Sequence, residues 1–468
     1  MNLKKRRILA FFVIYTIVVL TLLFLFIFQQ SKLSQNYIKV DYSESIGRIN
    51  LDYGSNEVAN WMDFVGRDEI KMFHRDAGSK FIRIWIDDPD YRKNSTIPYS
   101  QGSYDFIKFD SIVNSVLESD AIPFIVIAHA PDEMSMNYGT EENANPPINN
   151  DIFSEYCAEI VRHYKKACEE DNLSKKCNID EWYWEIWNEP YWDHWWQDET
   201  YIKMYNQAYY SIKNVAPNTK VGGYTLKFLS SSDKKQANDF LEKAYGIDFI
   251  SLHIYGNYLI PSFKDEIYIK NVDNDFMRNE YRNEMINHNK DSFFKQINEF
   301  NDAVKKSKNS NAEIIISELG PNWNWLYEPY FDEPFVSAWY ASALNWMIKT
   351  NAVDKEFYYS GTSNYEKGGF AMWSANDFSK SINLFPVYHM KTQFVKYNKK
   401  GSYLYYSESN NPKIESIAVS NDEGYFITVI NKKNYHIENI KINVENLGST
   451  PGSTINLSPY EIKFIKIK

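Results

Sequence analysis

Short apolar runs that alternate with amphipathic stretches constrain the fold of this chain more than any other feature. Eight runs have the length and the β-branched or aromatic content of strands, and they cover residues 47–51, 81–86, 122–128, 181–187, 220–224, 248–254, 313–317 and 356–359. Because the runs are almost continuously apolar, each strand is expected to be buried on both faces, as in a parallel sheet covered by helices. Eight alternations of strand and helix predict an α/β protein with a (β/α)8 barrel over residues 46–397.

The stretches between these runs have the periodicity of helices. In residues 201–215, the apolar side chains fall at positions 201, 204, 205, 208, 212 and 215, which share one helix face. Residues 105–117, 152–167, 293–304 and 335–348 repeat the pattern. Pro386 suits the first turn of a last helix that extends to Tyr397.

The pattern changes after residue 397. Short strand-like runs cover residues 403–406, 414–419, 425–430, 437–444 and 461–467, and turns rich in Asn, Gly and Ser separate them. We therefore expect residues 398–468 to form a small β-sandwich domain.

The N-terminus carries a strong local signal. Residues 8–28 form a charge-free run that would span about 31 Å as a helix, enough for a bilayer core of about 30 Å. The basic residues at positions 4–7 favour a cytoplasmic N-terminus, and no small-residue cleavage site follows the run. The sequence predicts a transmembrane anchor within residues 1–30, a polar tether over 31–45, and a catalytic part outside the cell membrane. A cleaved signal peptide is the alternative.

Composition narrows the function. The net charge of −10 disfavours nucleic acid as a partner. Aromatic residues make up 17% of the chain, and their rings suit stacking on sugars. The sequence contains no HExxH, GxGxxG, P-loop or GxSxG motif, so neither a metal nor another cofactor is implied. Cys168 and Cys177 could close a short loop in an oxidising compartment, or they could stay unpaired like Cys157.

Two predicted strands end in glutamate. The fourth runs into Asn188-Glu189-Pro190, and the seventh runs into Glu318. Reacting groups of (β/α)8 barrels sit at the C-terminal ends of strands, so both carboxyl groups should face the barrel mouth. Glycoside hydrolysis requires two such carboxyl groups, one to donate a proton and one that is ionised. We therefore take Glu189 and Glu318 as the candidate catalytic pair.

The segments around these two residues resemble a known group of enzymes. WEIWNEP at the end of the fourth strand, LHIY in the sixth and ISELG in the seventh are similar to the clan A retaining glycosidases, which are (β/α)8 barrels. Glycoside hydrolase family 39, with its β-xylosidases, α-L-iduronidases and related exopolysaccharide hydrolases, is the most similar family. The resemblance implies that Glu189 is the acid/base, that Glu318 is the nucleophile, and that Asn188 contacts the sugar 2-hydroxyl. It also implies a C-terminal β-domain.

Supporting residues follow from strand alternation. Arg83 is expected to point into the barrel beside Glu318 and to keep that carboxylate ionised. His253 and Tyr255 alternate along the sixth strand, so both can face the mouth. Tyr255 is expected to donate a hydrogen bond to Glu318, and His253 to bind sugar or support the network.

Further candidates are less directly placed. Trp323 is the expected stacking platform for a sugar, and Trp373 could reach the site from the loop after the eighth strand. His129, at the end of the third strand, is either a sugar contact or a core residue. Glu185 lies one pleat below Glu189 and is a competing acid, although its depth would separate it from substrate.

The sequence thus predicts a membrane-anchored glycosidase that acts on extracellular or surface polysaccharide by double displacement. A transglycosylase would use the same residues, and a glycan-binding barrel without catalysis is a further alternative. The sequence leaves open which sugar is recognised and whether cleavage is internal or terminal.

Overall fold

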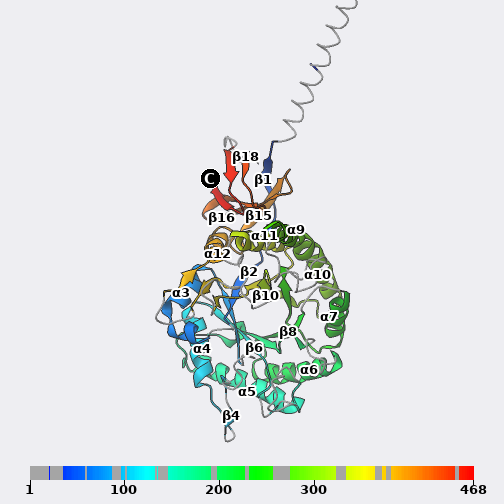
Figure 1. Cartoon of the computed structure of the whole chain (residues 1–468). Coiled ribbons are helices and arrows are strands. Elements are labelled where there is room, and N and C mark those ends of the chain that lie inside the picture. The colour runs from blue at the N-terminus through cyan, green and yellow to red at the C-terminus, as the bar shows by residue number, and fades with distance from the viewer. Residues whose placement is uncertain are drawn as a thin grey trace, which may run out of the picture.

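The computed structural model contains an eight-stranded barrel ringed by helices, with a β-sheet domain on one side (Figure 1). The structure describes residues 21, 35–57, 61–86, 96–97, 99–100, 103–131, 134, 146–190, 198–226, 231–256, 275–322, 334–363, 371–375, 381–447 and 453–468. All structural statements refer to these residues.

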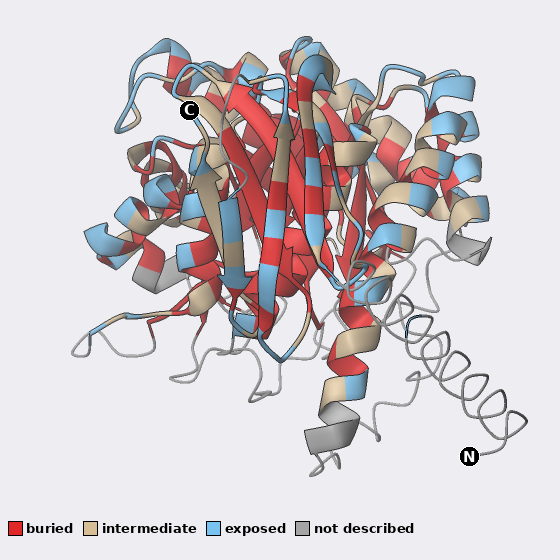
Figure 2. Cartoon of the chain, turned by 90° about the horizontal axis from the view of Figure 1, so that it is seen from above, coloured by how far each residue is buried: buried red, intermediate tan, exposed pale blue. Residues whose placement is uncertain are grey.

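Eight parallel strands close the barrel, and each pairs with the strands on either side. In order around it they are β2 (Asp52–Asn56), β3 (Phe81–Trp85), β6 (Ile122–Ile127), β7 (Tyr183–Ile186), β8 (Lys220–Leu226), β9 (Phe249–Tyr255), β10 (Glu313–Gly320) and β11 (Lys355–Tyr358). This confirms the predicted (β/α)8 barrel. Buried residues gather in the interior of the molecule, and exposed residues lie on the outer surfaces of the helices and along the strands nearest the viewer (Figure 2).

The helices pack around this barrel. They are α2 (Trp61–Gly66), α3 (Asp68–Asp76), α4 (Ile107–Glu118), α5 (Asn150–Glu169), α6 (Asp198–Val215), α7 (Ser231–Lys243), α9 (Asp275–Lys290), α10 (Ile297–Lys306), α11 (Pro334–Thr350) and α12 (Pro386–Tyr397). A π-helical turn, η7 (Asp291–Gln296), connects α9 with α10, and a 3-10 turn, η3 (Ile179–Glu181), precedes β7. Short strands complete the loops: β4 (Tyr99–Ser100), β5 (Ser103–Tyr104), β12 (Thr362–Ser363), β13 (Trp373–Ser374) and β14 (Asn383–Leu384).

The first barrel strand lies further along the chain than expected. The prediction placed it at residues 47–51, whereas β2 covers Asp52–Asn56. All five residues of β2 are buried although most are small or polar. Asn56 donates to the backbone of Ser317, and Ser55 bonds to His74, so hydrogen bonds replace apolar contacts in this strand.

Seven strands form the second domain as one continuous sheet. The strands are β1 (Tyr37–Arg48), β15 (Tyr403–Ser409), β16 (Ile414–Asn421), β17 (Gly424–Asn431), β18 (Ile437–Glu445), β19 (Ser453–Leu457) and β20 (Ile462–Lys466), and their order is β19-β18-β1-β15-β16-β17-β20. The expected sandwich of two sheets is therefore wrong in this detail. The reason is β1, which pairs with β15 on one side and β18 on the other and so joins the two halves.

Strand β1 also corrects the predicted tether over residues 31–45. From Tyr37 onward this segment is a strand whose buried positions alternate with more exposed ones. Ile38, Val40 and Tyr42 point into the core of the sheet domain, and Lys39 and Asp41 lie on the opposite face. Because the outer face of β1 is polar, the sequence of this segment resembles that of a polar linker.

The sheet domain rests on the barrel through α11 and α12. The Asn345 amide donates to the Glu415 carboxylate of β16 at 2.9 Å, and Lys349 donates to the backbone of Ser416 at 2.9 Å. Ile417, Val419 and Phe426 of the sheet belong to the same hydrophobic core as the barrel helices. The two domains therefore share a packed interface.

Two predictions remain, one for a transmembrane anchor at the N-terminus and one for the pairing of the cysteines. The predicted anchor, residues 8–28, lies outside the described residues except for Thr21. Among the helices that the structure describes, none combines the length and the apolar character that crossing a bilayer requires. Cys168 and Cys177 form a disulfide between the end of α5 and the segment before η3, and Cys157 is free and buried.

Candidate active site

The candidate site residues come from separate strands and meet at the C-terminal end of the barrel. Arg83 lies in β3, His253 and Tyr255 in β9, and Glu318 in β10. Glu189 lies in the turn after β7. Glu318 and His253 are register partners in adjacent strands, which brings their side chains together.

The Glu318 carboxylate is held from two sides. Nη1 of Arg83 donates to its Oε1 at 2.8 Å, and the Tyr255 hydroxyl donates to its Oε2. Burial and then the Glu318 charge raise the pKa of Tyr255 well above its usual range, so this phenol stays protonated and remains a donor. Both predicted contacts of Glu318 are present. A carboxylate with a cation and a fixed donor is stabilised in its ionised form.

Glu189 reaches the same space through an unusual turn. The backbone has a positive φ at Trp187, 71°, and at Glu189, 44°, a region that non-glycine residues rarely adopt. The backbone N–H of Glu189 donates to Oγ1 of Thr225, at the end of β8, at 2.5 Å. Such strain is held in place by surrounding contacts and is common at functional sites. The turn aims the Glu189 side chain toward the barrel axis, where it is 18% exposed.

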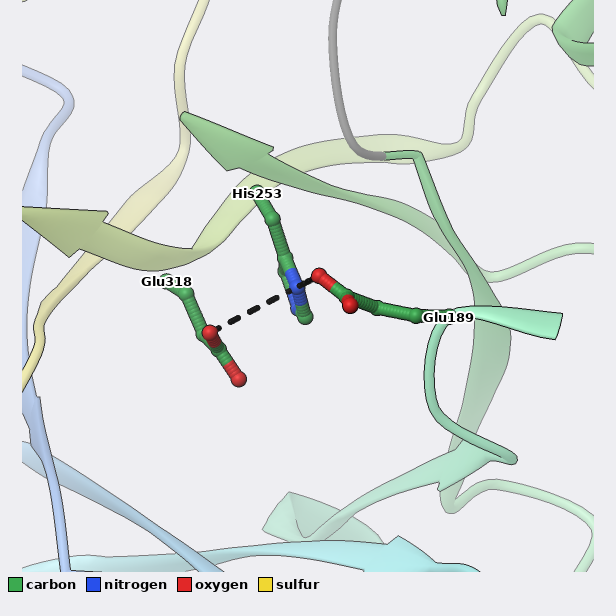
Figure 3. A group of neighbouring side chains, drawn as sticks. All are labelled: Glu189, His253 and Glu318. Atoms are coloured by element: carbon green, nitrogen blue, oxygen red, sulfur yellow. Dashed lines mark hydrogen bonds and ion pairs between the residues drawn. The ribbon is translucent and has the colours of Figure 1, made fainter. Parts of the chain in front are cut away.

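His253 lies between the two carboxylates (Figure 3). Its Nδ1 is 2.6 Å from Oε1 of Glu189 and 3.6 Å from Oε2 of Glu318. One oxygen of each carboxylate and one nitrogen of this ring all lie within 4.8 Å of one another. The two glutamates therefore face each other across a short gap.

The three groups could also ligate a metal ion. Their present contacts favour another use, because Glu318 already accepts hydrogen bonds from the Arg83 guanidinium and the Tyr255 hydroxyl. A fixed guanidinium disfavours a second cation at the same carboxylate. The arrangement suits acid, base and nucleophilic chemistry by two carboxyl groups.

Arg83 is the centre of a buried network. Besides Glu318, its guanidinium donates to Glu185 through Nε at 2.8 Å and Nη2 at 2.6 Å, to Asn188 at 3.0 Å and to Asn56 at 3.1 Å. Burial disfavours its charge, but the carboxylates of Glu185 and Glu318 outweigh burial and raise the pKa of Arg83. Arg83 is therefore a permanent cation that fixes the position of Asn188 as well as Glu318.

The remaining predicted residues have mixed outcomes. Trp373 is fully buried; its indole N–H donates to Thr362 at 2.7 Å and its ring packs on His74 and Phe73. It is a core residue and contacts neither glutamate, so the expectation that it reaches the site is wrong. His129 lies at the mouth between the rings of Trp85 and Trp187. Trp323 lies outside the described residues.

Three residues that contact Arg83 in the site were not predicted in this role from the sequence. Asn56 bonds to Arg83 but lies in the strand that was misplaced. Trp85 lies two residues after Arg83 on the same side of β3, and its ring is 5.4 Å from the guanidinium carbon. Glu185 was weighed only as a competing acid, whereas it is the main partner of Arg83. Strand alternation in FIRIW could have identified Trp85.

The fold and the facing carboxylates define a (β/α)8 barrel of the glycoside hydrolase class. More narrowly, the chain belongs to the glycosyl hydrolases family 39, whose family model matches residues 48–424.

Individual relatives agree with this assignment. The chain is 27% identical over 237 residues to a β-xylosidase from Caldicellulosiruptor saccharolyticus, covering 47% of this chain and 46% of that protein. It is 27% identical over 206 residues to a β-xylosidase from Geobacillus stearothermophilus, covering 40% and 38%. The matched part thus spans less than half the length of these relatives. A family 39 β-xylosidase structure from Caulobacter crescentus shares the fold, with a TM-score of 0.62 at 14% identity over 88% of this chain and 84% of that one.

Proposed function

We propose that this protein is a retaining glycoside hydrolase with Glu318 as nucleophile and Glu189 as acid/base. The observation that carries the proposal is the gap between the two carboxylates, whose nearest oxygens lie within 4.8 Å. Retaining glycosidases hold the two carboxyl groups about 5–5.5 Å apart, whereas inverting enzymes leave about 6.5–9.5 Å for a water. The short gap favours direct attack on the sugar.

The contacts give each residue its role. Arg83 and Tyr255 hold and orient the Glu318 carboxylate, so that it can attack the anomeric carbon and form a glycosyl ester. Protonated Glu189 gives its proton to the departing oxygen. Glu189 then takes a proton from water, and the resulting hydroxide equivalent cleaves the ester and releases Glu318. His253, whose Nδ1 is 2.6 Å from Oε1 of Glu189, holds that carboxyl group in place.

The proposal extends to substrate and location. The β-xylosidase relatives support a β-linked pyranoside, and xylosides are the first substrates to test. The apolar run at residues 8–28 supports a membrane anchor with the barrel outside, where extracellular or surface polysaccharide is the accessible substrate. The Cys168–Cys177 disulfide agrees with an oxidising compartment.

Replacement of the nucleophile tests the mechanism. We expect Glu318→Gln to lower kcat/KM by about 10³-fold or more on an aryl β-xyloside, with the fold intact because Arg83 keeps its Glu185 partner. A 2-deoxy-2-fluoro glycoside should label Glu318 in the wild type, and peptide mass spectrometry would locate the adduct. Near wild-type turnover by Glu318→Gln would refute the assignment. Sugar binding without turnover in the wild type would favour a glycan-binding barrel, and product transfer to an added acceptor would favour a transglycosylase.

A further inference from the structure

A second carboxylate lies beneath the proposed catalytic pair. Glu185 in β7 is fully buried, and its Oε2 accepts two hydrogen bonds from Arg83. Among the described residues, its Oε1 has no hydrogen-bond partner. Burying a carboxylate with one oxygen unpaired is costly, so packing alone gives no reason for a glutamate at this position.

The charges around Arg83 are unevenly shared. Glu185 takes two of its N–H groups and Glu318 takes one, so a single positive charge serves two negative ones. Among the described residues, the charged or titratable groups that face Glu318 are Arg83 from β3, His253 and Tyr255 from β9, and Glu189 after β7. Those that face Glu185 are Arg83 and, from α6, Tyr201. The network as a whole is therefore rich in negative charge.

We propose that Glu185 is a positioning residue that fixes the Arg83 guanidinium and compensates part of its positive charge. Glu318 is then stabilised less strongly by Arg83 and remains a strong nucleophile. The proposal rests on the assignment of Glu318 as nucleophile. A carboxylate that faced an uncompensated guanidinium would be stabilised further, and a more stable anion is less basic and attacks more slowly. Glu185 thus limits the stabilisation that Arg83 gives to Glu318.

The variant Glu185→Gln tests this role through the pH profile of kcat/KM. With the charge removed, Arg83 acts on Glu318 alone and lowers its pKa. We expect the acidic limb to move to lower pH by roughly one unit, with kcat reduced about tenfold. A merely structural role predicts the opposite sign, because a loosened Arg83 would release Glu318 and raise its pKa.

Two further variants complete the test. Glu185→Asp keeps the charge, so its acidic limb should stay at the wild-type pH even if kcat falls. Glu356→Gln is the matched control, because Glu356 is also a fully buried barrel glutamate, paired with Lys391 at 3.3 Å, but lies outside the site. Glu356→Gln should lower the free energy of unfolding and leave the acidic limb of the pH profile at its wild-type position.

The outcomes separate the two proposals. An acidic limb of Glu185→Gln that stays in place or moves to higher pH would overturn the role of Glu185, as would a shift of equal size in Glu356→Gln. If Glu185→Gln does not fold, a limb at higher pH in Glu185→Asp would overturn it. Retained activity in Glu318→Gln would instead overturn the proposed function itself.

Discussion

The two ends of the barrel both bury a cation among carboxylates, yet they are built differently. At the N-terminal end, Lys355 donates to Glu313 at 2.6 Å, and its ammonium lies 5.1 Å and 4.6 Å from the ring centroids of Phe81 and Tyr183. Around it, a cluster of large side chains fills the barrel: Phe81, Phe124, Tyr183, Phe249, Ile315 and Phe357. At the C-terminal end, Arg83 faces two carboxylates.

The comparison shows that one end of the barrel contributes mainly to stability and the other mainly to reactivity. At the N-terminal end Lys355 at 2.6 Å and Lys220 at 3.7 Å both pair with Glu313, and aromatic faces stabilise the charge of Lys355, so the arrangement favours cohesion. At the C-terminal end two carboxylates, Glu185 and Glu318, share one permanent cation, Arg83, so the site keeps a surplus of negative charge. Surplus charge costs stability and provides reactive groups. Variants at the C-terminal end should therefore lower activity, and variants at the N-terminal end should lower stability.

The largest effect is expected at the catalytic end. Glu189→Gln should lower kcat/KM by about 10³-fold on an alkyl xyloside, whose leaving oxygen needs a proton, and far less on an aryl glycoside with an acidic leaving group. Steady-state kinetics on the two substrates would measure the contrast. The melting temperature should hardly change, because Glu189 is partly exposed. Equal losses on both substrates would argue against general acid catalysis by Glu189.

The next effect is expected at the aromatic end. Phe357 is fully buried, with its ring centroid 4.8 Å from that of Phe124. Phe357→Ala should lower the free energy of unfolding by about 3–5 kcal/mol through lost burial and a cavity. The kcat of the folded fraction should stay within about twofold of wild type. Ile107→Ala, at a side chain that is 76% exposed, is the control and should cost less than about 0.5 kcal/mol.

Replacing the cation of the aromatic end should have a smaller effect. Lys355→Met removes the nearer of the two lysines that pair with Glu313, but that carboxylate keeps Lys220 at 3.7 Å, is 23% exposed and can be hydrated. The expected loss is about 2 kcal/mol, below the usual cost of breaking a fully buried pair. Urea unfolding would measure the loss, and assays below the transition would check that kcat is retained. A fall in kcat with an unchanged free energy of unfolding would contradict the view that the N-terminal end contributes only to stability.

The smallest effect is expected for Tyr183→Phe. The Tyr183 hydroxyl donates to Glu313 at 2.9 Å, and burial together with the Glu313 charge raises the pKa of Tyr183 above its usual value. The phenol is therefore a neutral donor at every pH the enzyme tolerates. Its removal should cost about 1 kcal/mol, with no dependence on pH between 5 and 9. A pH-dependent loss would show that the hydroxyl titrates in this range.

Most of the barrel could be predicted because its strands are apolar on both faces. Seven of the predicted runs overlap barrel strands, and Pro386 opens α12 as expected. The first strand was misplaced because β2 is stabilised by hydrogen bonds of Ser55 and Asn56, which a search for apolar runs cannot detect. The run at 47–51 contains Ile49 and Leu51, which are buried outside the barrel strands.

The candidate site was predictable where strand position alone sets direction. Glu318, Arg83 and Tyr255 meet because alternation and strand ends place them at one mouth. Trp373 could not be placed in this way, because its contact with His74 of α3 comes from a segment distant in the sequence, and its bond to Thr362 depends on the pairing of β12 with β13. The preference of Arg83 for Glu185 was equally hidden, since only the register of β3, β6 and β7 brings the two together.

Strand β1 has a consequence for how the chain folds during synthesis. Arg48 of β1 and Tyr403 of β15 are 355 positions apart, and the sequence of the whole barrel lies between them. At typical rates of about 5–20 residues per second, β1 leaves the ribosome roughly 20–70 s before its first partner. During this interval the strand has two unsatisfied edges that could pair with other nascent chains. The polar outer face, with Lys39, Asp41 and Glu44, protects it from such pairing until the last strands arrive.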